Sequence, residues 1–435
     1  MSDSLVPQLP IVGGAPDEDV ARAPTDWRTS AMQRRIRRRY AAERRFRLLG
    51  LGAILLSAAF LAFLLVSMLG SGLRGFTQAE VRIDIDFPRS TLMIDPATLD
   101  GFGADAALAS ADIDGAVRAA AEAQHGPDGS ELLSQGAWLR VRDALKDDPA
   151  LLGRRASFWL PASSEIDLAA KSDAPAAAER RHAQLDAAGA VRTGFNLDFL
   201  TSADGTDPTG VGIWGAFKGS LLTMLVTLAL AFPVGVLSAV YLEEYAPRNR
   251  WTDFIEVSIN NLAAVPSIIF GLLGLAVFLN FMHLPRSAPL VGGLVLALMT
   301  MPVIVIAGRN AIKSVPPSIR DAALGVGASR IQVVFHHVLP LALPGILTGT
   351  IIGMARALGE TAPLLMIGMR AFIASPPGGI TEPATVLPVQ IFLWSDEVSR
   401  GFVEKTSAAI IVLLVFLLAM NGSAIYLRNK FERRW

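Results

Sequence analysis

Residues 320–331 read RDAALGVGASRI, and residues 355–363, further along the same region, read ARALGETAP. The residues between 341 and 354 carry no charged side chain. The first stretch mixes charged, small and apolar residues, which is typical of a surface segment. The second places Arg356 and Glu360 in a run long enough to cross a bilayer, so charge is predicted inside a membrane. A surface segment that continues directly into a membrane helix therefore decides the fold.

The composition of the whole chain also indicates a membrane protein. Of 435 residues, 52% are hydrophobic and 18% are charged, and the mean hydropathy is +0.43. These values are too apolar for an ordinary soluble domain. Basic and acidic residues number 39 each, so the net charge indicates no partner. Cysteine is absent, which excludes disulfides and thiolate metal sites.

Changes in composition divide the chain into four segments. Residues 1–47 are expected to be a disordered and basic cytoplasmic N-terminal arm, because Pro, Gly, Ala and Asp dominate its start and arginines crowd residues 34–47. Residues 48–74 are predicted to form the first transmembrane helix. Residues 75–210 form an extracytoplasmic insert, and residues 211–435 form a second membrane domain that contains a cytoplasmic loop, 314–340.

The insert is predicted to have mixed α and β structure. Residues 81–87 alternate apolar and charged side chains, which indicates a strand, and residues 112–124 and 131–145 are helix candidates. Its many Asp and Glu residues lack the spacing of a calcium loop. They are therefore interpreted as a solvated acidic surface, and no metal site is predicted.

Five further apolar spans bring the predicted number of transmembrane helices to six. The five lie at residues 220–241, 254–281, 290–307, 341–369 and 407–427. Arginine and lysine in the short loops after residues 241 and 307 and after residue 427 place these loops, and both termini, in the cytoplasm. The fold class predicted is an all-α polytopic membrane protein with an α/β extracytoplasmic insert between helices 1 and 2.

The fifth span combines a smooth face with the charged pair. Gly345, Gly349 and Gly353 recur every four residues, so another helix can approach closely. Arg356 and Glu360 are also four residues apart and can pair along the helix. The pair is either a structural ion pair or part of a translocation path. We favour the path, because ionisable groups within membranes are usually functional.

The surface segment is predicted to hold two short helices. Ser318 precedes Asp321 at capping-box spacing, Gly327 suits a left-handed helix end, and Ser329 precedes Gln332 at the same spacing. The apolar contacts of this pair would be Leu324, Ile331 and Val334. Periodicity alone leaves open whether the pair packs on its own protein or docks on another one.

Four groups of residues resemble a known family. Asp321-Ala322-Ala323, followed by Gly327 and later by Leu339-Pro340, resembles the EAA coupling loop of ABC-importer permeases, with Asp in place of Glu and with His337 at a position that is usually aliphatic. Residues 265–275, 301–307 and 355–365 resemble the phosphate-specific permeases, and Glu360-Thr361-Ala362-Pro363 resembles the PstA type rather than the PstC type. The resemblance covers about residues 215–435, and the preceding residues are similar to an N-terminal extension found in some members.

The resemblance implies a transport subunit of the bacterial inner membrane that is not an enzyme and needs no cofactor. Its type I importer permease domain would work with a homologous PstC-like permease, a cytoplasmic PstB-like ATPase dimer and a periplasmic PstS-like phosphate-binding protein. No phosphate-binding loop motif occurs in this chain, so ATP hydrolysis is assigned to the partner. The residues implied in ATPase coupling are Asp321, Ala322, Ala323, Gly327, Ser329 and Arg330, and those implied in the substrate path are Arg356, Glu360 and Thr361.

Two alternatives remain at this stage. The coupling loop is generic to importers, so the substrate could be another oxyanion such as sulfate or molybdate. A membrane sensor whose insert binds a ligand is less consistent with the sequence, because no cytoplasmic output domain follows residue 427.

Overall fold

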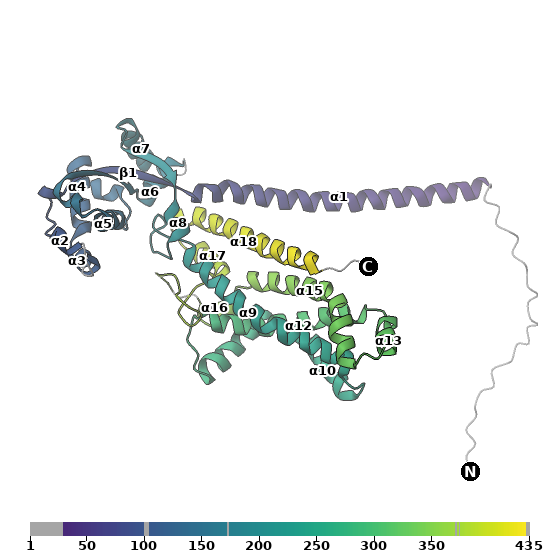
Figure 1. The fold of residues 1–435 in the computed structure, drawn as a ribbon. Coiled ribbons are helices and arrows are strands. Elements are labelled where there is room, and N and C mark those ends of the chain that lie inside the picture. The colour runs from purple at the N-terminus through teal and green to yellow at the C-terminus, as the bar shows by residue number, and fades with distance from the viewer. Residues whose placement is uncertain (1–28, 100–103, 172–173, 370–371, 374, 432–435) are drawn as a thin grey trace, which may run out of the picture. The chain divides into compact units, whose positions relative to one another are not determined.

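The computed structural model describes residues 29–99, 104–171, 174–369, 372–373 and 375–431, and these are mostly helical (Figure 1). The chain divides into two compact units, Met1–Val66 and Ser67–Trp435. Among the residues that the structure describes, five helices are long and apolar enough to span a membrane, or six if one bent pair counts as a single span. The fold class predicted from the sequence is confirmed.

The first unit contains most of one long helix, α1 (Ser30–Gly75). Residues 30–47, expected to be disordered, are helical. Arginine, glutamate and alanine are good helix formers, and the apolar span that follows extends the same helix, so the costly first turn is formed only once. Arg47 also pairs with Glu43 one turn earlier, at 2.6 Å. The prediction of disorder for residues 1–28 lies outside the described residues.

The insert is built on a three-stranded antiparallel sheet. Strand β1 (Thr77–Asp86) lies between β2 (Arg155–Pro161) and β3 (Val191–Phe195). The alternating side chains Ala79, Val81, Ile83 and Ile85 are all buried, as their period of two predicts. Around this sheet lie α2 (Pro96–Leu99), α3 (Ala104–Ser110), α4 (Ile113–His125), α5 (Trp138–Asp147), α6 (Ser164–Ala170), α7 (Ala176–Ala187) and α8 (Leu197–Thr201), with short 3-10 turns η1 (Phe87–Arg89), η2 (Gly129–Leu132) and η3 (Pro149–Gly153).

Two expectations for the insert need correction. The helix predicted for residues 131–145 begins only at Trp138, because residues 129–132 form the turn η2 and Leu133 bridges to Ala162. The acidic side chains are also not all solvated. Asp167 is buried and accepts hydrogen bonds from the Ala79 amide and from Lys171. It therefore pairs a backbone N–H group and a buried ammonium group inside the fold.

The membrane domain begins after the insert. Its elements are α9 (Trp214–Val240), η4 (Tyr241–Tyr245), α10 (Arg250–Ala263), α11 (Ser267–Leu273), η5 (Gly274–Phe281), α12 (Pro289–Lys313), α13 (Pro317–Gly325), α14 (Arg330–Gln332), η6 (Val333–Val338), α15 (Leu339–Gly359), α16 (Ala362–Met366), α17 (Leu387–Ser395) and α18 (Gly401–Phe431). The segments η4, η5 and η6 are π-helical.

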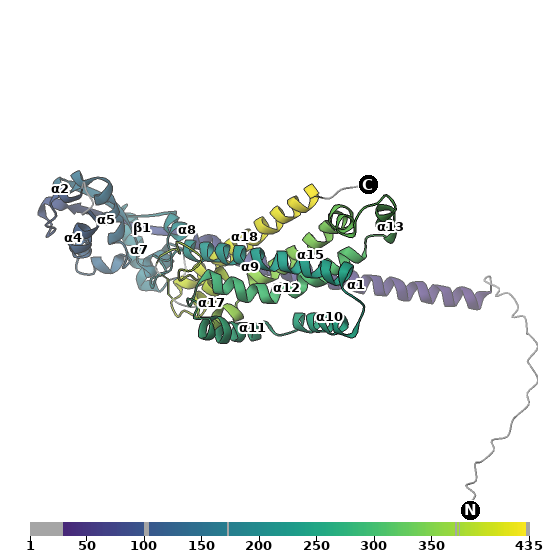
Figure 2. The ribbon, with the colours of Figure 1, turned by 60° about the horizontal axis from the view of Figure 1, so that its bottom comes forward.

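Two spans predicted as single helices are broken. The span 254–281 consists of α10, α11 and η5. The chain bends by 103° between α10 and α11, which are separate helices in Figure 2. Pro266 lies at this break and disfavours a helical conformation of the residue before it. The span 341–369 ends as α15 at Gly359, because Glu360 has an extended backbone, and a short α16 follows. The fifth span is therefore not one rigid rod.

Candidate functional site

The surface segment of the sequence folds into a protrusion, residues 317–338, which we call the knob. It contains α13, a turn, α14 and η6. Helix α13 begins with Pro317 at its first position, so the cap predicted at Ser318 is wrong: a proline-led start needs no capping side chain. The helix ends as predicted, since Gly327 has φ of 90°.

The turn of the knob is specified locally. The amide of Ala328 bonds to the carbonyl of Ala323 and that of Gly327 to Leu324, which is the Schellman arrangement. Ser329 then starts α14 with the predicted capping box, in which Gln332 bonds back to the Ser329 amide at 2.9 Å. The knob therefore has a defined shape without any partner.

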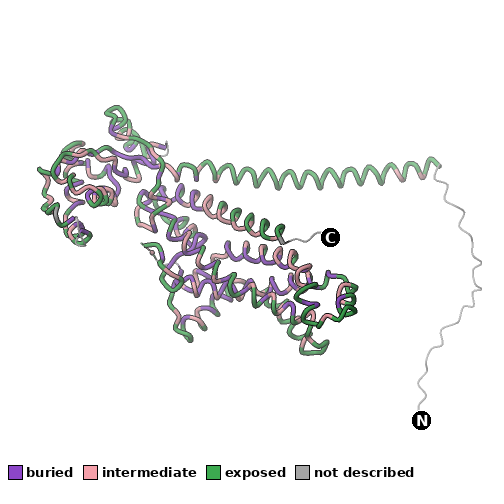
Figure 3. Tube along the Cα trace, viewed as in Figure 1, coloured by how far each residue is buried: buried purple, intermediate pink, exposed green. Residues whose placement is uncertain are grey.

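The outer surface of the knob is unusually apolar. Leu324, Val326, Ile331 and Phe335 are 48%, 86%, 63% and 44% exposed, and the knob is largely exposed in Figure 3. Of the three apolar contacts predicted for this helix pair, Val334 packs inside the chain, whereas Leu324 and Ile331 face outward. Exposed apolar side chains of this kind are typical of a contact with another protein or with a membrane.

The residues implied in coupling share this surface, with one exception. Asp321, Ala322, Gly327, Ser329 and Arg330 are exposed. Ala323 is buried and packs into the apolar cluster under the knob. It therefore supports the knob from inside and does not offer a contact to a partner.

The glycine stripe of α15 faces α12. An added Cβ would lie 2.7 Å from the Ala311 Cβ at Gly345, 2.1 Å from the Ala307 Cβ at Gly349, and 2.9 Å from the Thr300 side chain at Gly353. Only glycine allows the two helices this close. The stripe thus fixes α15 against α12 along most of its length.

The charged pair lies where α15 ends. Arg356 Nε is 3.5 Å from Glu360 Oε1, and the two side chains are 50% and 19% exposed. Glu360 is the last, non-helical residue of the α15 end, and Thr361 follows it directly before α16. The pair and the knob lie at opposite ends of α15 (Figure 1), whose 21 residues span about 30 Å at about 1.5 Å per residue. The predicted residues therefore form two sites and not one.

Sequence reasoning missed the ion pairs beneath the knob. Arg320 of α13 pairs with Glu244 of η4 at 2.7 Å, and Arg309 of α12 pairs with both Glu243 and Glu256. One signal could have found them: charged residues at or within apolar spans require partners. The partner could not be named from the sequence, because Arg320 and Glu244 are 76 residues apart.

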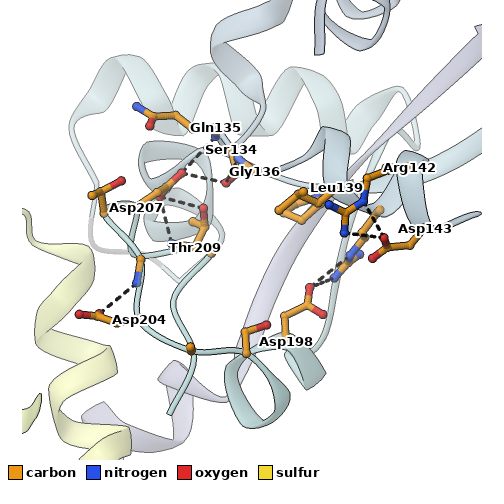
Figure 4. Close-up of a pocket in the computed structure, with 17 residues that line it drawn as sticks. Ser134, Gln135, Gly136, Leu139, Arg142, Asp143, Asp198, Asp204, Asp207 and Thr209 are labelled. Atoms are coloured by element: carbon orange, nitrogen blue, oxygen red, sulfur yellow. Dashed lines mark hydrogen bonds and ion pairs between the residues drawn. The ribbon is translucent and has the colours of Figure 1, made fainter. Parts of the chain in front are cut away.

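A cavity of about 470 Å³ lies in the second unit, between the start of α5 and the segment 198–210 (Figure 4). Asp207 accepts hydrogen bonds from Ser134 and Thr209, and Arg140 pairs with Asp198 at 2.9 Å. Arg142 likewise pairs with Asp143. Since both arginines of the wall are already paired, the cavity offers no free cation to an anionic ligand.

One carboxyl group of that wall joins the insert to the membrane domain. Burial raises the pKa of Asp204, although the indole N–H of Trp394 in α17 donates to it at 3.0 Å and stabilises its charge. The cavity therefore belongs to a structural joint.

Family comparisons agree with this architecture. Residues 231–434 match the model described as "Binding-protein-dependent transport system inner membrane component", and residues 33–179 match a "Domain of unknown function (DUF3333)". The chain is 32% identical over 254 residues to the probable ABC transporter permease protein YqgI of Bacillus subtilis (strain 168), covering 53% of this chain and 85% of that protein.

Two other similarities concern a phosphate permease and a solved transporter. Over 224 residues the chain is 35% identical to the phosphate transport system permease protein PstA 1 of Mycobacterium tuberculosis (strain ATCC 25618 / H37Rv), covering 51% of this chain and 71% of that protein. An inward-facing structure of the MetNI methionine ABC transporter aligns with a TM-score of 0.40 and 17% identity over 51% of this chain and 95% of that chain. The extent and identity of the Bacillus match show that the chain is a multi-pass inner-membrane protein of the binding-protein-dependent transport family, a non-catalytic ABC-transporter permease whose ATPase is a separate subunit.

Proposed function

We propose that this chain is the PstA-like permease subunit of an ATP-driven phosphate importer. The observation that carries the substrate is the 35% identity to a phosphate permease over about half of the chain. Sulfate and molybdate are the rival substrates, since the knob is generic to importers. The other half of the path would come from a PstC-like permease, with a PstS-like binding protein and a PstB-like ATPase dimer as the remaining partners.

The proposed orientation places both termini and the knob in the cytoplasm. Arginine-rich segments flank the first and last spans and the knob, which favours the cytoplasmic side for all three. In this orientation the insert and the Arg356–Glu360 pair lie toward the other side. The apolar surface of the knob can then fill a groove of the ATPase dimer.

The proposed mechanism assigns a role to each end of α15. ATP-driven closure of the ATPase dimer would move the knob, and the membrane helices would convert this movement into alternating access. The guanidinium of Arg356 attracts the anion, while the Glu360 carboxylate holds Arg356 in place and competes with the anion, which keeps binding weak enough for release. Thr361 lies beside Glu360 and adds a hydroxyl to the path.

The substrate is tested by reconstituting the chain with the three partners in proteoliposomes. Phosphate, with its binding protein, should stimulate ATP hydrolysis and appear inside the vesicles, whereas sulfate and molybdate should do neither. Uptake of sulfate or molybdate in place of phosphate would overturn the substrate assignment.

The docking role of the knob is tested at Gly327. Proline cannot adopt its φ of 90°, so Gly327→Pro should unfold the turn and lower ATPase co-purification and coupled turnover by about tenfold or more. Gly325→Ala is the matched control, because a Cβ there meets no atom within 4 Å and no positive φ is needed. Unchanged co-purification and coupled turnover of Gly327→Pro would show that the ATPase binds elsewhere.

A further inference from the structure

We infer that a relay of partly buried ion pairs carries the movement of the knob to the bent helix pair α10–α11, and through it to the segment that holds Glu360. The inference rests on the proposed function, in which the knob contacts the ATPase and Glu360 belongs to the anion path. It adds a second route between the two ends, separate from α15. The residues that form it are Glu243, Glu244, Glu256, Arg309 and Arg320.

The first joint of the relay fixes the knob to η4. Arg320 Nη2 donates to Glu244 Oε1 at 2.7 Å and to the Ile312 carbonyl at 3.0 Å, while Nη1 donates to the Val315 carbonyl at 2.7 Å. The Arg320 and Glu244 side chains are only 22% and 12% exposed. All three nitrogens of Arg320 are thus engaged within the chain, so this arginine ties α13 to η4 and is not free to bind the ATPase.

The second joint starts from the adjacent residue of the same π-helical turn. Arg309 Nε lies 3.4 Å from Glu243 Oε2, and its Nη1 lies 2.9 Å from Glu256 Oε1. Its Nη2 donates to the other oxygen of Glu256 at 2.9 Å, so the Arg309–Glu256 pair is bidentate. Arg309 is 15% exposed and joins η4, α12 and α10 in one cluster.

Helix α10 is well suited to follow this cluster. None of its residues is buried within the described chain, so few apolar contacts hold it to the core. The bidentate Arg309–Glu256 pair is therefore a directional part of its attachment, beside the packing of the partly buried Ile259. A helix held in this way can move relative to α12 without disrupting a packed core.

The last joint connects α10 to the charged pair. At the 103° bend α10 meets α11, which packs on α16. The two approach so closely that a Cβ on Gly271 would lie 2.7 Å from the Pro363 Cα. Pro363 is three residues beyond Glu360, so a tilt of α11 displaces the Glu360 carboxylate and changes its contact with Arg356.

The test separates coupling from assembly in the reconstituted complex. Arg309→Gln should leave ATPase co-purification and ATP hydrolysis intact while phosphate uptake per ATP falls about tenfold or more. Lys313→Gln is the matched control on the same helix and should couple normally. Lys313 is 64% exposed, and its contact with Glu243 is long, at 4.0 Å. Arg320→Glu and Glu244→Arg should each uncouple, and the double variant should recover part of the loss.

A distance measurement tests the relay independently of the substrate. The chain has no cysteine, so spin labels can be placed at Ser258→Cys on α10 and Ser395→Cys at the end of α17 without background from this chain, and this chain is labelled before it is assembled with its partners. Trapping the ATPase with ATP and vanadate should change this distance in the otherwise unchanged protein and not in Arg309→Gln. A distance change of equal size in Arg309→Gln, or a charge-swap variant no better than the single variants, would overturn the relay. If the otherwise unchanged protein shows the distance change but takes up no phosphate, the proposed substrate is wrong and the relay still holds.

Discussion

At the level of single residues, the unequal exposure of Arg356 and Glu360 supports the different roles that we propose for them. The carboxylate is 19% exposed and sits at a helix end fixed by the turn into α16, whereas the guanidinium is 50% exposed. The less exposed partner is the better anchored one. Under the proposed function, Glu360 therefore positions the pair, and Arg356 is the group that reaches the anion.

Neutralising this arginine gives the first prediction. Arg356→Gln keeps the length and polarity of the side chain but removes the positive charge, so phosphate uptake should fall by about tenfold or more, the loss of about 1.4 kcal/mol or more of anion attraction. The four subunits should still co-purify. Arg250→Gln, an exposed arginine at the start of α10, is the control and should transport normally. Normal uptake by an assembled Arg356→Gln complex would remove Arg356 from the path.

At the level of elements, features that depend on nearby residues could be predicted from the sequence, whereas features that depend on residues far apart in the chain could not. The five long apolar spans and β1 follow from length and periodicity, and the turn at Gly327 and the cap at Ser329 depend on residues within a few positions. Strands β2 and β3 were missed, because they are short and are defined by pairing with β1. The break at Pro266 was missed because a proline in a membrane helix is often tolerated as a kink, and its neighbours decide the outcome.

The knob and the ion-pair relay also differ in how far the sequence predicts them. The knob was found with most of its residues because its signal is contiguous in sequence. The inward position of Ala323 and the outward position of Ile331 depend on what lies beneath the knob, which periodicity does not report. The relay joins η4, α10, α12 and α13, and no local pattern pairs residues across four elements.

The contact between α12 and α15 gives a prediction for elements. Gly349→Ala would place a Cβ 2.1 Å from the Ala307 Cβ, so the two helices must separate, at a cost of about 1–3 kcal/mol. The thermal unfolding temperature of the purified chain in detergent should fall. Gly359→Ala, at the end of the same helix, is the control, since its Cβ would meet no atom within 4 Å. Equal unfolding temperatures would show that the helices accommodate the methyl group at no cost.

At the level of the whole molecule, buried charge joins the insert to the membrane domain. Lys171 of the insert donates to Asp167 at 2.7 Å and to Glu404 of α18 at 2.9 Å. Beside this group Lys405 Nζ donates to the carbonyl of Gly75 at 3.0 Å. All four charged side chains are less than 10% exposed. The insert is therefore fixed to the first turns of the last membrane helix rather than tethered by a flexible linker.

The last prediction concerns removal of the insert. The chain enters it at Gly75, which packs on Ala408, and leaves it near Pro208, which packs on Gly401, so a short Gly-Ser linker can replace residues 76–209. This deletion leaves Glu404 and Lys405 without Asp167 and Lys171. It also removes Phe199 from the apolar cluster that contains Trp394 and Phe402, so the deleted protein should unfold at a lower temperature. Glu404→Gln in the full chain leaves Lys171 buried with one carboxylate partner fewer, and it should also lower the unfolding temperature, because breaking a buried ion pair costs about 3–5 kcal/mol. Phosphate uptake by the deleted protein would then measure what the insert itself contributes to transport, and an unchanged unfolding temperature of full-length Glu404→Gln would show that the buried ion cluster does not hold the insert in place.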